Sequence, residues 1–518
     1  MNHTAEKQTR RTVAVLLAAL LLALTLLSGC DPEEIEGEGA LSYSAEAMYN
    51  IYYDVCAIPR SGSAYPSQIN AYIKEYAQSV GLTPVEDAAG NVVVEVPATE
   101  GLAEAPVVIF QTYTDAVIAY APSLLFDPDV QGVEVSLNTA NRISAQGMSM
   151  GADSAGGITT LLALMHTENA HGPYRLIFTA YGTSTCSGAR QLDARYLEGG
   201  LLVNVSGDSV TSVVGGSRFA DVRTTEAAIT TAAVTNRYAY VLAVADLAPA
   251  VTDTGNRTVN AVSILTEVLS TAKGAGIQYE LCSFETVGGS PYSPQTARAV
   301  VVLNDYEQSK FRQTFNSVTK TYKDSATGSP DMRMIETVPP AECLSNEDVN
   351  RLVSCLFGLT TTSFSEEDGI SATLSINSLS ISPAGAEISY LLEADTAQAL
   401  AVAMEEQKGI ERLSEITFDE KESLPGVLPA EDNEFITAFL AALAEAAGTS
   451  PEYARVVSVC ELGYFREANA DIPIVSIGVE VLGRGATTES LLLSNLAVPA
   501  NACAELLVHV VEMTEVEE

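Results

Sequence analysis

The chain has 518 residues, of which 47% are hydrophobic, and this supplies enough apolar material for two or three domains with their own cores. Its formal net charge of −39 excludes nucleic acid as a partner and excludes an electrostatic hold on anionic lipid, because phosphate groups would meet a surface of the same sign. The eight cysteines are scattered without a Cys-x-x-Cys pair, so the sequence predicts neither a zinc ribbon nor a dense disulfide framework.

The first 30 residues carry the pattern of an export signal. Basic residues precede an apolar run that ends at Leu27-Ser28-Gly29-Cys30. This pattern resembles a bacterial lipoprotein signal, which implies a signal peptide at residues 1–29 and a lipid on the sulfur of Cys30. The alternative is an uncleaved membrane helix, but the run is barely long enough to span a bilayer. We therefore expect lipid anchoring on the extracytoplasmic face of a bacterial cell membrane, with residues 30–41 as an acidic tether.

Residues 42–217 alternate between helical and strand patterns. In chain order, the expected elements are helices at 43–57 and 67–80, strands at 91–98 and 106–113, a buried helix at 154–169, a strand at 174–182, a helix at 188–197 and a strand at 200–207. Gly81 is placed to end the second helix. The alternation predicts the first part of an α/β domain, with a mixed sheet flanked by helices.

The pattern changes between residues 218 and 424. Helices at 259–276 and 306–324 are interleaved with antiparallel strand pairs, which predicts an inserted α+β lid domain. The order of helix, strand pair, helix and strand occurs at 255–337 and again at 345–420, which suggests a duplication within the lid.

The α/β pattern returns after residue 425, so residues 425–518 are expected to complete the first domain. The expected elements are a helix at 433–448, strands at 455–465 and 472–481, and a closing helix at 499–515.

Three polar stretches lie where strand ends should meet: "QTYTDAV", "GMSMGADSAGGI" and "FTAYGTSTCSGA". With "ENAHGP" before a strand and the closing "IGVEVLGRGATTESL", the chain resembles the co-catalytic zinc exopeptidases that include carnosinases. Within them it is most similar to bacterial aminoacyl-histidine dipeptidases, whose lid domain is also inserted and long. The resemblance implies an α/β zinc-exopeptidase-like fold that is split by the lid.

The resemblance also assigns site positions, and most carry the wrong residue for a zinc peptidase. Asp115 matches the aspartate that orients a histidine ligand, and Asp153 matches the aspartate that bridges two zinc ions. The histidine itself is replaced by Tyr113, and the general base falls on Gly182. The remaining ligand positions fall on Thr183, Ser206 and Gly485.

We therefore expect no catalytic residue and no cofactor, although the resembled family uses zinc. A weak calcium or magnesium site at the vestigial Asp115 and Asp153 is the alternative, because the surviving donors are oxygen atoms. The structural interpretation is that both aspartates cap turns, with Asp153 accepting N–H groups at a helix start. Tyr113 is then expected to fill the space of the zinc and imidazole, with its hydroxyl on one aspartate.

Other candidates carry less chemistry. Glu461 matches a glutamate that shapes the family's pocket, and Arg298 aligns with a lid segment that contacts a substrate carboxylate, so both are possible cleft contacts. An exposed arginine at a strand start is the alternative for Arg298. The four histidines (His3, His166, His171 and His509) are interpreted as structural.

Three functions stay open after this comparison. The first is a membrane-anchored lipoprotein that keeps the dipeptidase shape without its hydrolysis and binds a peptide or an amino-acid-derived ligand. The second is an active metal-dependent dipeptidase with altered ligation. The third is a structural envelope lipoprotein with a closed cleft. The sequence gives no oligomeric state and predicts no nucleic-acid partner.

Overall fold

The computed structural model describes residues 43–516, except for residue 64, 122–123, 168, 184, 246, 248–258, 288–293, 326–329, 362–371, 431 and 459. The predicted signal peptide, the tether and the lipidation site Cys30 lie outside the described residues.

The candidate site is built on an eight-stranded mixed sheet in the order β1-β2-β6-β3-β7-β20-β8-β19. Strand β3 (Val108–Tyr113) lies at its centre, parallel to β6 (Tyr174–Thr179) and to β7 (Leu201–Asn204). The other strands are β1 (Pro84–Glu86), β2 (Val92–Val96), β8 (Ser212–Ser217), β19 (Glu452–Val457) and β20 (Ile474–Ser476). All six residues of β3 are buried, as expected of a parallel strand that is covered on both faces.

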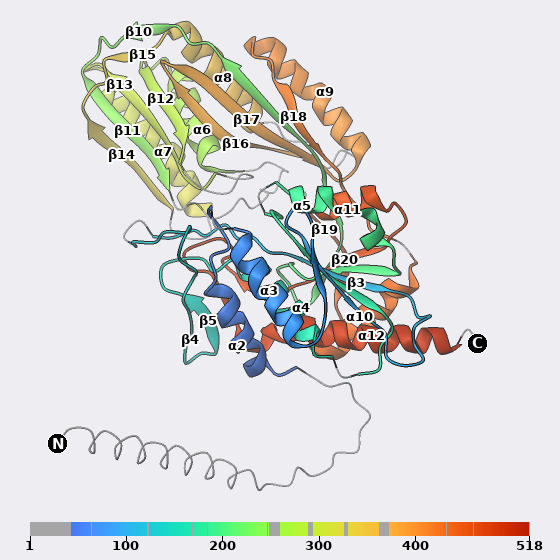
Figure 1. The fold of residues 1–518 in the computed structure, drawn as a ribbon. Helices are drawn as coiled ribbons and strands as arrows, with labels where there is room; N and C mark the ends of the chain where they lie inside the picture. The colour runs from blue at the N-terminus through green and yellow to red at the C-terminus, as the bar shows by residue number, and fades with distance from the viewer. Residues whose placement is uncertain are drawn as a thin grey trace, which may run out of the picture. The chain divides into compact units, whose positions relative to one another are not determined.

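Helices cover both faces of this sheet (Figure 1). Phe110 and Phe178 belong to the main core, which α2 (Ala45–Cys56), α3 (Ser67–Ser79), α4 (Ala152–Leu164), α10 (Glu434–Ala447) and α12 (Val498–Val516) complete. Ile109 and Ile177 point to the opposite face, against α5 (Ser187–Gln191), the 3-10 helix η1 (Ala194–Leu197) and α11 (Leu462–Ala468). The alternation of neighbouring residues between two cores follows from the two-residue period of a strand.

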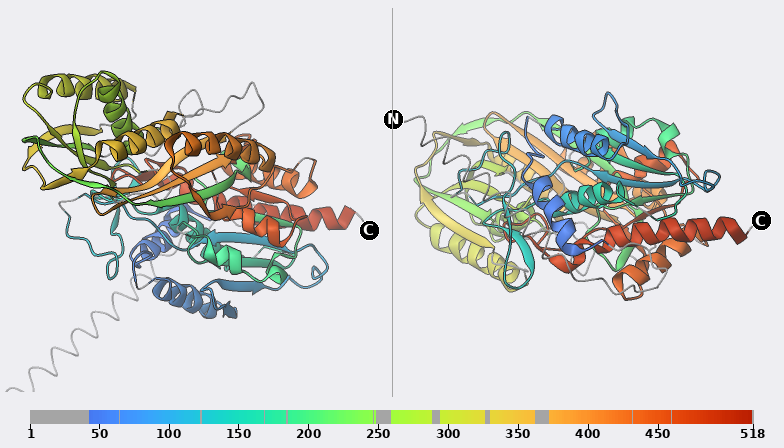
Figure 2. Two further views of the ribbon diagram at one scale, coloured as in Figure 1. Left: turned by 90° about the horizontal axis from the view of Figure 1, so that it is seen from above. Right: turned by 60° about the horizontal axis from the view of Figure 1, so that its bottom comes forward.

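Helix α12 lies beside α10 along its length, as two views show (Figure 1, Figure 2). The segment Leu493–Met513 is long and apolar enough to cross a membrane, with a mean hydropathy of 1.4 in its most apolar window. More than half of that window (56%) is buried inside the protein, and Cys503, Leu506 and Leu507 belong to the main core. The helix is therefore a core element of this domain.

A separate four-stranded sheet, in the order β21-β22-β5-β4, joins two segments that are distant in sequence. Its strands are β4 (Val135–Leu137), β5 (Arg142–Ala145), β21 (Val481–Leu482) and β22 (Ser490–Leu492), and the 3-10 helix η3 (Leu493–Leu496) follows β22. The pairing of β22 with β5 brings the loop around residue 485 to the same part of the fold as the start of α4.

Residues 219–424 form a second eight-stranded sheet, in the order β14-β11-β13-β12-β16-β17-β9-β18. Its strands are β9 (Phe219–Ala227), β11 (Tyr238–Ala245), β12 (Glu280–Thr286), β13 (Ala297–Leu303), β14 (Asp331–Thr337), β16 (Ala372–Ser382), β17 (Gly385–Ala394) and β18 (Asp419–Leu424), and β10 (Thr231–Ala233) pairs with β15 (Glu342–Leu344) beside it. Its helices are α6 (Ala261–Gly274), α7 (Gln308–Ser325), α8 (Asn346–Thr361) and α9 (Ala397–Ser414). The described elements run helix, strand, strand, helix, strand twice, from α6 to β14 and from α8 to β18.

The predicted fold class is confirmed: a mixed sheet flanked by helices is interrupted in sequence by an α+β sheet with its own core. Gly81 has a φ of +84° directly after the α3 C-cap, the left-handed conformation that glycine adopts at low cost. The domain limits and the duplication stay predictions. The seven described cysteines are free.

Three predicted elements are wrong in detail. The strand expected at 472–481 is divided between β20, which ends at Ser476, and β21, which begins at Val481 and belongs to the four-stranded sheet. The helix expected at 188–197 is broken into α5 and η1, because Asp193 adopts an extended conformation and caps η1 with its side chain. The strand expected at 455–465 ends at Val457 and is followed by α11. Glu461 therefore lies at the N-cap of α11 and not inside a strand, and from this position its side chain enters the site described below.

Candidate functional site

The predicted site residues gather where β3 ends and α4 begins. Tyr113 closes β3, Asp115 follows it, and Asp153 lies in the first turn of α4. Gly151 caps α4 with a φ of +60°, and a Cβ there would lie 2.5 Å from the Cβ of Ala116, so only glycine fits. We call Tyr113, Asp115, Asp153, Gly182, Thr183, Glu461 and Arg484 the strand-tip site.

Both oxygens of the Asp153 carboxylate accept hydrogen bonds from protein donors. The Tyr113 hydroxyl donates to its Oδ2 at 2.6 Å, and the Arg484 guanidinium donates to the same oxygen through Nε at 2.9 Å and Nη2 at 2.5 Å. The backbone N–H of Ser154 donates to Oδ1 at 2.8 Å. Arg484 Nη2 also reaches the Tyr113 oxygen at 3.1 Å. The sequence predicts that the Tyr113 hydroxyl contacts one of the two aspartates, and the structure has this contact with Asp153.

These donors decide the charge state of Asp153. Its burial acts to raise the pKa, but the Arg484 guanidinium, the Tyr113 hydroxyl and the Ser154 N–H together hold the pKa below its usual value. Burial and the neighbouring Asp153 charge raise the pKa of the Tyr113 phenol well above its usual value. Asp153 is therefore a carboxylate whose charge is balanced by a guanidinium, and Tyr113 is a neutral phenol that donates to it.

Asp115 has a different partner. The backbone N–H of Thr183 lies 3.1 and 3.2 Å from its two oxygens, and the Thr183 hydroxyl donates to Oδ2 at 2.6 Å. Burial raises the pKa of Asp115 in spite of these donors. Asp115, a residue that the resembled family also has, is thus held by Thr183, which stands at a position where that family has a metal ligand.

Gly182, the position of the family's general base, has no room for a side chain. A Cβ on Gly182 would lie 2.3 Å from the Cβ and 2.7 Å from the Cγ of Tyr113. The same Cβ would lie 3.1 Å from Glu461 Oε2. The tyrosine and the glycine are therefore packed as a pair, and a carboxylate from a distant part of the sequence lies beside the position where the base would begin.

Glu461 is buried: the residue is 2% exposed, and both of its carboxylate oxygens accept hydrogen bonds. Gln111 Nε2 donates to Oε1 at 2.7 Å and the Thr179 hydroxyl donates to Oε2 at 2.8 Å. Burial raises the pKa of Glu461 to about 7, although these two donors act to lower it. Glu461 is thus a buried proton-binding group within the protein, and it lies in the site as the sequence comparison suggested.

The remaining predicted residues are placed as follows. Ser206 is buried and shares a 2.6 Å hydrogen bond with the hydroxyl of Thr112 under β3. Gly485 has a φ of +70°, and its N–H donates to Glu489 Oε1 at 2.9 Å. Arg298 lies in β13 of the second sheet, exposed and paired across the strands with Glu285, so among the described residues no hydrogen bond or ion pair joins it to the strand-tip site.

Two residues of the site were missed from the sequence. Arg484 was not predicted, because the family resemblance assigned the ligand position to its neighbour Gly485. The arginine next to a lost ligand position was the signal that could have indicated it. Glu489 is 1% exposed and accepts the N–H groups of Met150 at 2.5 Å, Ala152 at 3.4 Å and Gly485 at 2.9 Å. It ties the Arg484 loop to the start of α4, and no sequence signal indicated this role.

Comparisons with known proteins agree with this geometry at the level of fold. No protein-family model matches the chain. A curated relative, the cytosol non-specific dipeptidase of Escherichia coli (strain K12), is 26% identical over 166 residues, which is 32% of this chain and 34% of that protein. The match thus spans about a third of the relative's length.

Solved structures match over nearly the whole chain. The aminoacylhistidine dipeptidase from Vibrio alginolyticus is 20% identical, with a TM-score of 0.60 over 91% of this chain and 98% of that one. A tripeptidase from Staphylococcus aureus is 14% identical, with a TM-score of 0.54 over 91% of this chain and 100% of that one. The predicted resemblance to aminoacyl-histidine dipeptidases is confirmed, and at these identities it shows a shared fold.

The expectation that no cofactor belongs here is wrong. Structures that this chain resembles include a Bacillus subtilis protein described as a dinuclear metal-binding peptidase of the M20 family, at 13% identity and a TM-score of 0.45 over 90% of this chain and 98% of that one. The prediction of no cofactor is withdrawn, together with the calcium or magnesium alternative.

The side chains of the strand-tip site, as they lie, do not fit a pair of zinc ions. Zinc sites use imidazole, thiolate or carboxylate donors with lone pairs free for the metal. Here the Asp153 oxygens accept hydrogen bonds from Arg484, Tyr113 and Ser154. The positive charge of the Arg484 guanidinium would repel a metal ion beside the same carboxylate. Among the described residues, the one group of three or more carboxylate, imidazole or thiol donors within 4.8 Å of one another lies elsewhere.

Proposed function

We propose that this chain is a lipid-anchored protein with a dipeptidase fold that binds a peptide or an amino-acid derivative without hydrolysing it. The observation that carries the proposal is the Asp153–Arg484–Tyr113 network, because it uses the carboxylate that would bridge two metal ions in the resembled peptidases. Lipid anchoring on the extracytoplasmic face rests on the sequence pattern that ends at Cys30.

Peptide hydrolysis by a metal-bound water has two requirements. A metal must lower the pKa of water from about 15.7 to about 7, and a carboxylate must accept the proton. The base position is Gly182, where packing against Tyr113 leaves no room for a side chain. Glu461 is the carboxylate beside that position, but its oxygens are held by Gln111 and Thr179 and its side chain is buried. These contacts favour a binding role over the second reading, an active dipeptidase with altered ligation.

The proposal is tested with the full-length chain in detergent, assayed against Xaa-His and general dipeptides with zinc, manganese and cobalt added in turn. We expect no turnover with any metal, and saturable binding of a dipeptide in a calorimetric titration. Turnover that disappears with a chelator would contradict the proposal. Absence of both turnover and binding would instead favour the structural lipoprotein with a closed cleft.

Anchoring is tested separately. In cells of the source bacterium, the wild-type chain should incorporate labelled fatty acid, whereas Cys30→Ala should not. The matched control is Cys460→Ala, because Cys460 is a free cysteine of the folded part. Equal labelling of wild type and Cys30→Ala would rule the lipid anchor out.

A further inference from the structure

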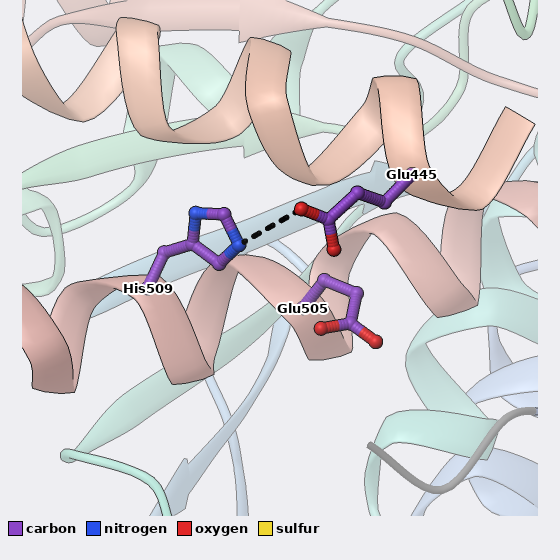
Figure 3. A group of neighbouring side chains, drawn as sticks. All are labelled: Glu445, Glu505 and His509. Carbon is purple, nitrogen blue, oxygen red and sulfur yellow. Dashed lines mark ion pairs between the residues drawn. The ribbon is translucent and has the colours of Figure 1, made fainter. Parts of the chain in front are cut away.

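A second group of titratable side chains lies on the helices α10 and α12, which carry none of the strand-tip residues. Glu445 comes from the last turn of α10, and Glu505 and His509 lie one helical turn apart on α12. Figure 3 shows the His509 ring facing the Glu445 carboxylate, with the Glu505 side chain beside them. We call Glu445, Glu505 and His509 the α10–α12 cluster.

The donors of the cluster have the spacing of metal ligands. One oxygen of each glutamate and one ring nitrogen of His509 all lie within 4.8 Å of one another. His509 Nε2 lies 3.8 Å from Glu445 Oε1, which is too long for a hydrogen bond. Two ligands in a tetrahedral zinc shell with bonds of about 2.1 Å are roughly 3.4 Å apart. Small side-chain adjustments therefore suffice to bring the three donors around one ion.

The histidine of the cluster differs from the other described histidines. The ring of His166 is hydrogen-bonded to the Tyr76 hydroxyl at 3.0 Å, and His171 Nδ1 is bonded to the carbonyl of Gly172 at 2.8 Å. Within the described part of the chain, no hydrogen bond to the His509 ring is present, and its side chain is 22% exposed. His166 and His171 are thus held by hydrogen bonds, whereas the contact of the His509 ring with Glu445 is the longer one of an ion pair.

The helices that carry the donors are held in place by the core. Phe439 and Leu443 of α10 and Leu506 and Val510 of α12 are buried in the main core, so the backbone positions of the three donors are fixed. Glu445 is exposed, and Glu505 and His509 are partly buried, which leaves the open side of the cluster to solvent. Such a geometry offers three protein ligands and a fourth position for water.

We propose that Glu445, Glu505 and His509 form a binding site for a divalent transition-metal ion of the zinc type. Two carboxylates and one imidazole match the donor preference of zinc, cobalt and nickel better than that of calcium or magnesium, which favour oxygen ligands alone. The ion would offset the repulsion between the two glutamates and would link the C-terminal helix α12 to α10. This site is independent of the strand-tip site and of the proposed function.

The test is a calorimetric titration of the full-length chain in detergent with zinc, repeated with cobalt so that an absorption spectrum reports the ligands. We expect one zinc site whose affinity falls at least about tenfold in His509→Gln, Glu445→Gln and Glu505→Gln, since loss of residues that only support metal ligands already costs that much. Two variants serve as controls and should keep the wild-type affinity: His166→Gln, which removes a hydrogen-bonded histidine, and Asp153→Asn, which alters the strand-tip site.

Each other outcome overturns the inference. Unchanged affinity in His509→Gln and Glu505→Gln would place the ion elsewhere. Loss of binding in Asp153→Asn with binding kept in His509→Gln would place it at the strand-tip site. No heat with zinc, and neither heat nor a spectrum with cobalt, would show that the cluster takes no such ion. Thermal melts of all variants distinguish loss of the site from loss of the fold.

Discussion

The strand-tip site and the α10–α12 cluster both gather acidic groups, but they neutralise them in different ways. At the strand tip, Asp153 is nearly buried and balanced by Arg484, and Tyr113 fills the space beside it. In the cluster, two glutamates face one imidazole at the surface, and the shortest ion-pair contact is 3.8 Å. The comparison teaches that residue types alone do not make a metal site, because a carboxylate whose charge is already balanced by a guanidinium is a poor ligand for a metal cation.

The largest expected effect tests how tightly the strand-tip site is packed. Gly182→Ala should destabilise the protein by about 3 kcal/mol, because its Cβ would overlap Tyr113. The matched control is Gly274→Ala at the end of α6, where a Cβ meets nothing within 4 Å and a helix former is favoured. Denaturant unfolding measures both variants. Equal stability of Gly182→Ala and wild type would mean that the site is open, like the cluster.

The next effect concerns protons. The folded pKa of Glu461, about 7, is above its ordinary value of 4.5, so its contribution to stability is fully present below pH 4.5 and is lost as the pH rises through 7. Glu461→Gln should remove this loss, which amounts to roughly 3 kcal/mol, and should flatten the dependence of Tm on pH between about 4.5 and about 7. Parallel profiles for the variant and wild type would show that Glu461 keeps an ordinary pKa.

The third expected effect is the loss of stability when the Arg484 guanidinium is removed from Asp153. Arg484→Ala leaves Asp153 without its counter-ion and should cost about 2 kcal/mol, less than for a fully buried pair because the Arg484 side chain is 48% exposed. Arg484→Lys should recover part of this, since a lysine keeps the charge but not the two-nitrogen contact. Chemical denaturation at pH 7 gives both values. If Arg484→Ala left the stability unchanged, the contrast between the strand-tip site and the α10–α12 cluster would not hold.

The smallest effect is expected in the cluster itself. In metal-free buffer, Glu445→Gln should change the stability by no more than about 0.5 kcal/mol, because Glu445 is exposed and its contact with His509 is long. The same denaturant titration measures it. A loss above about 1 kcal/mol would show that Glu445 already has a strong partner in the metal-free protein, and the cluster would then resemble the strand-tip site.

Much of the fold could be read from hydrophobic patterns. Apolar residues at helical spacing located α10 and α12, because burial of one helix face requires that period. Continuous apolar runs located β3 and α4, because an element that is covered on all sides has no polar face. The short elements near residues 188–197 and 455–465 were misjudged, because an Asp cap and a turn to α11 depend on local hydrogen bonds that hydrophobic patterns do not report.

The sequence by itself determined that Tyr113, Gly182, Thr183, Ser206 and Gly485 replace the residues that a zinc peptidase of this resemblance needs, because residue identity is fixed without any structure. Only the tertiary structure decided what took their place. Arg484 and Glu489 reach the start of α4 across more than 300 residues of chain, and Glu461 enters beside Gly182 from a helix cap. Contacts at such separations are set by strand order and packing, which is why the partners of Asp153 could not be named from its neighbours in sequence.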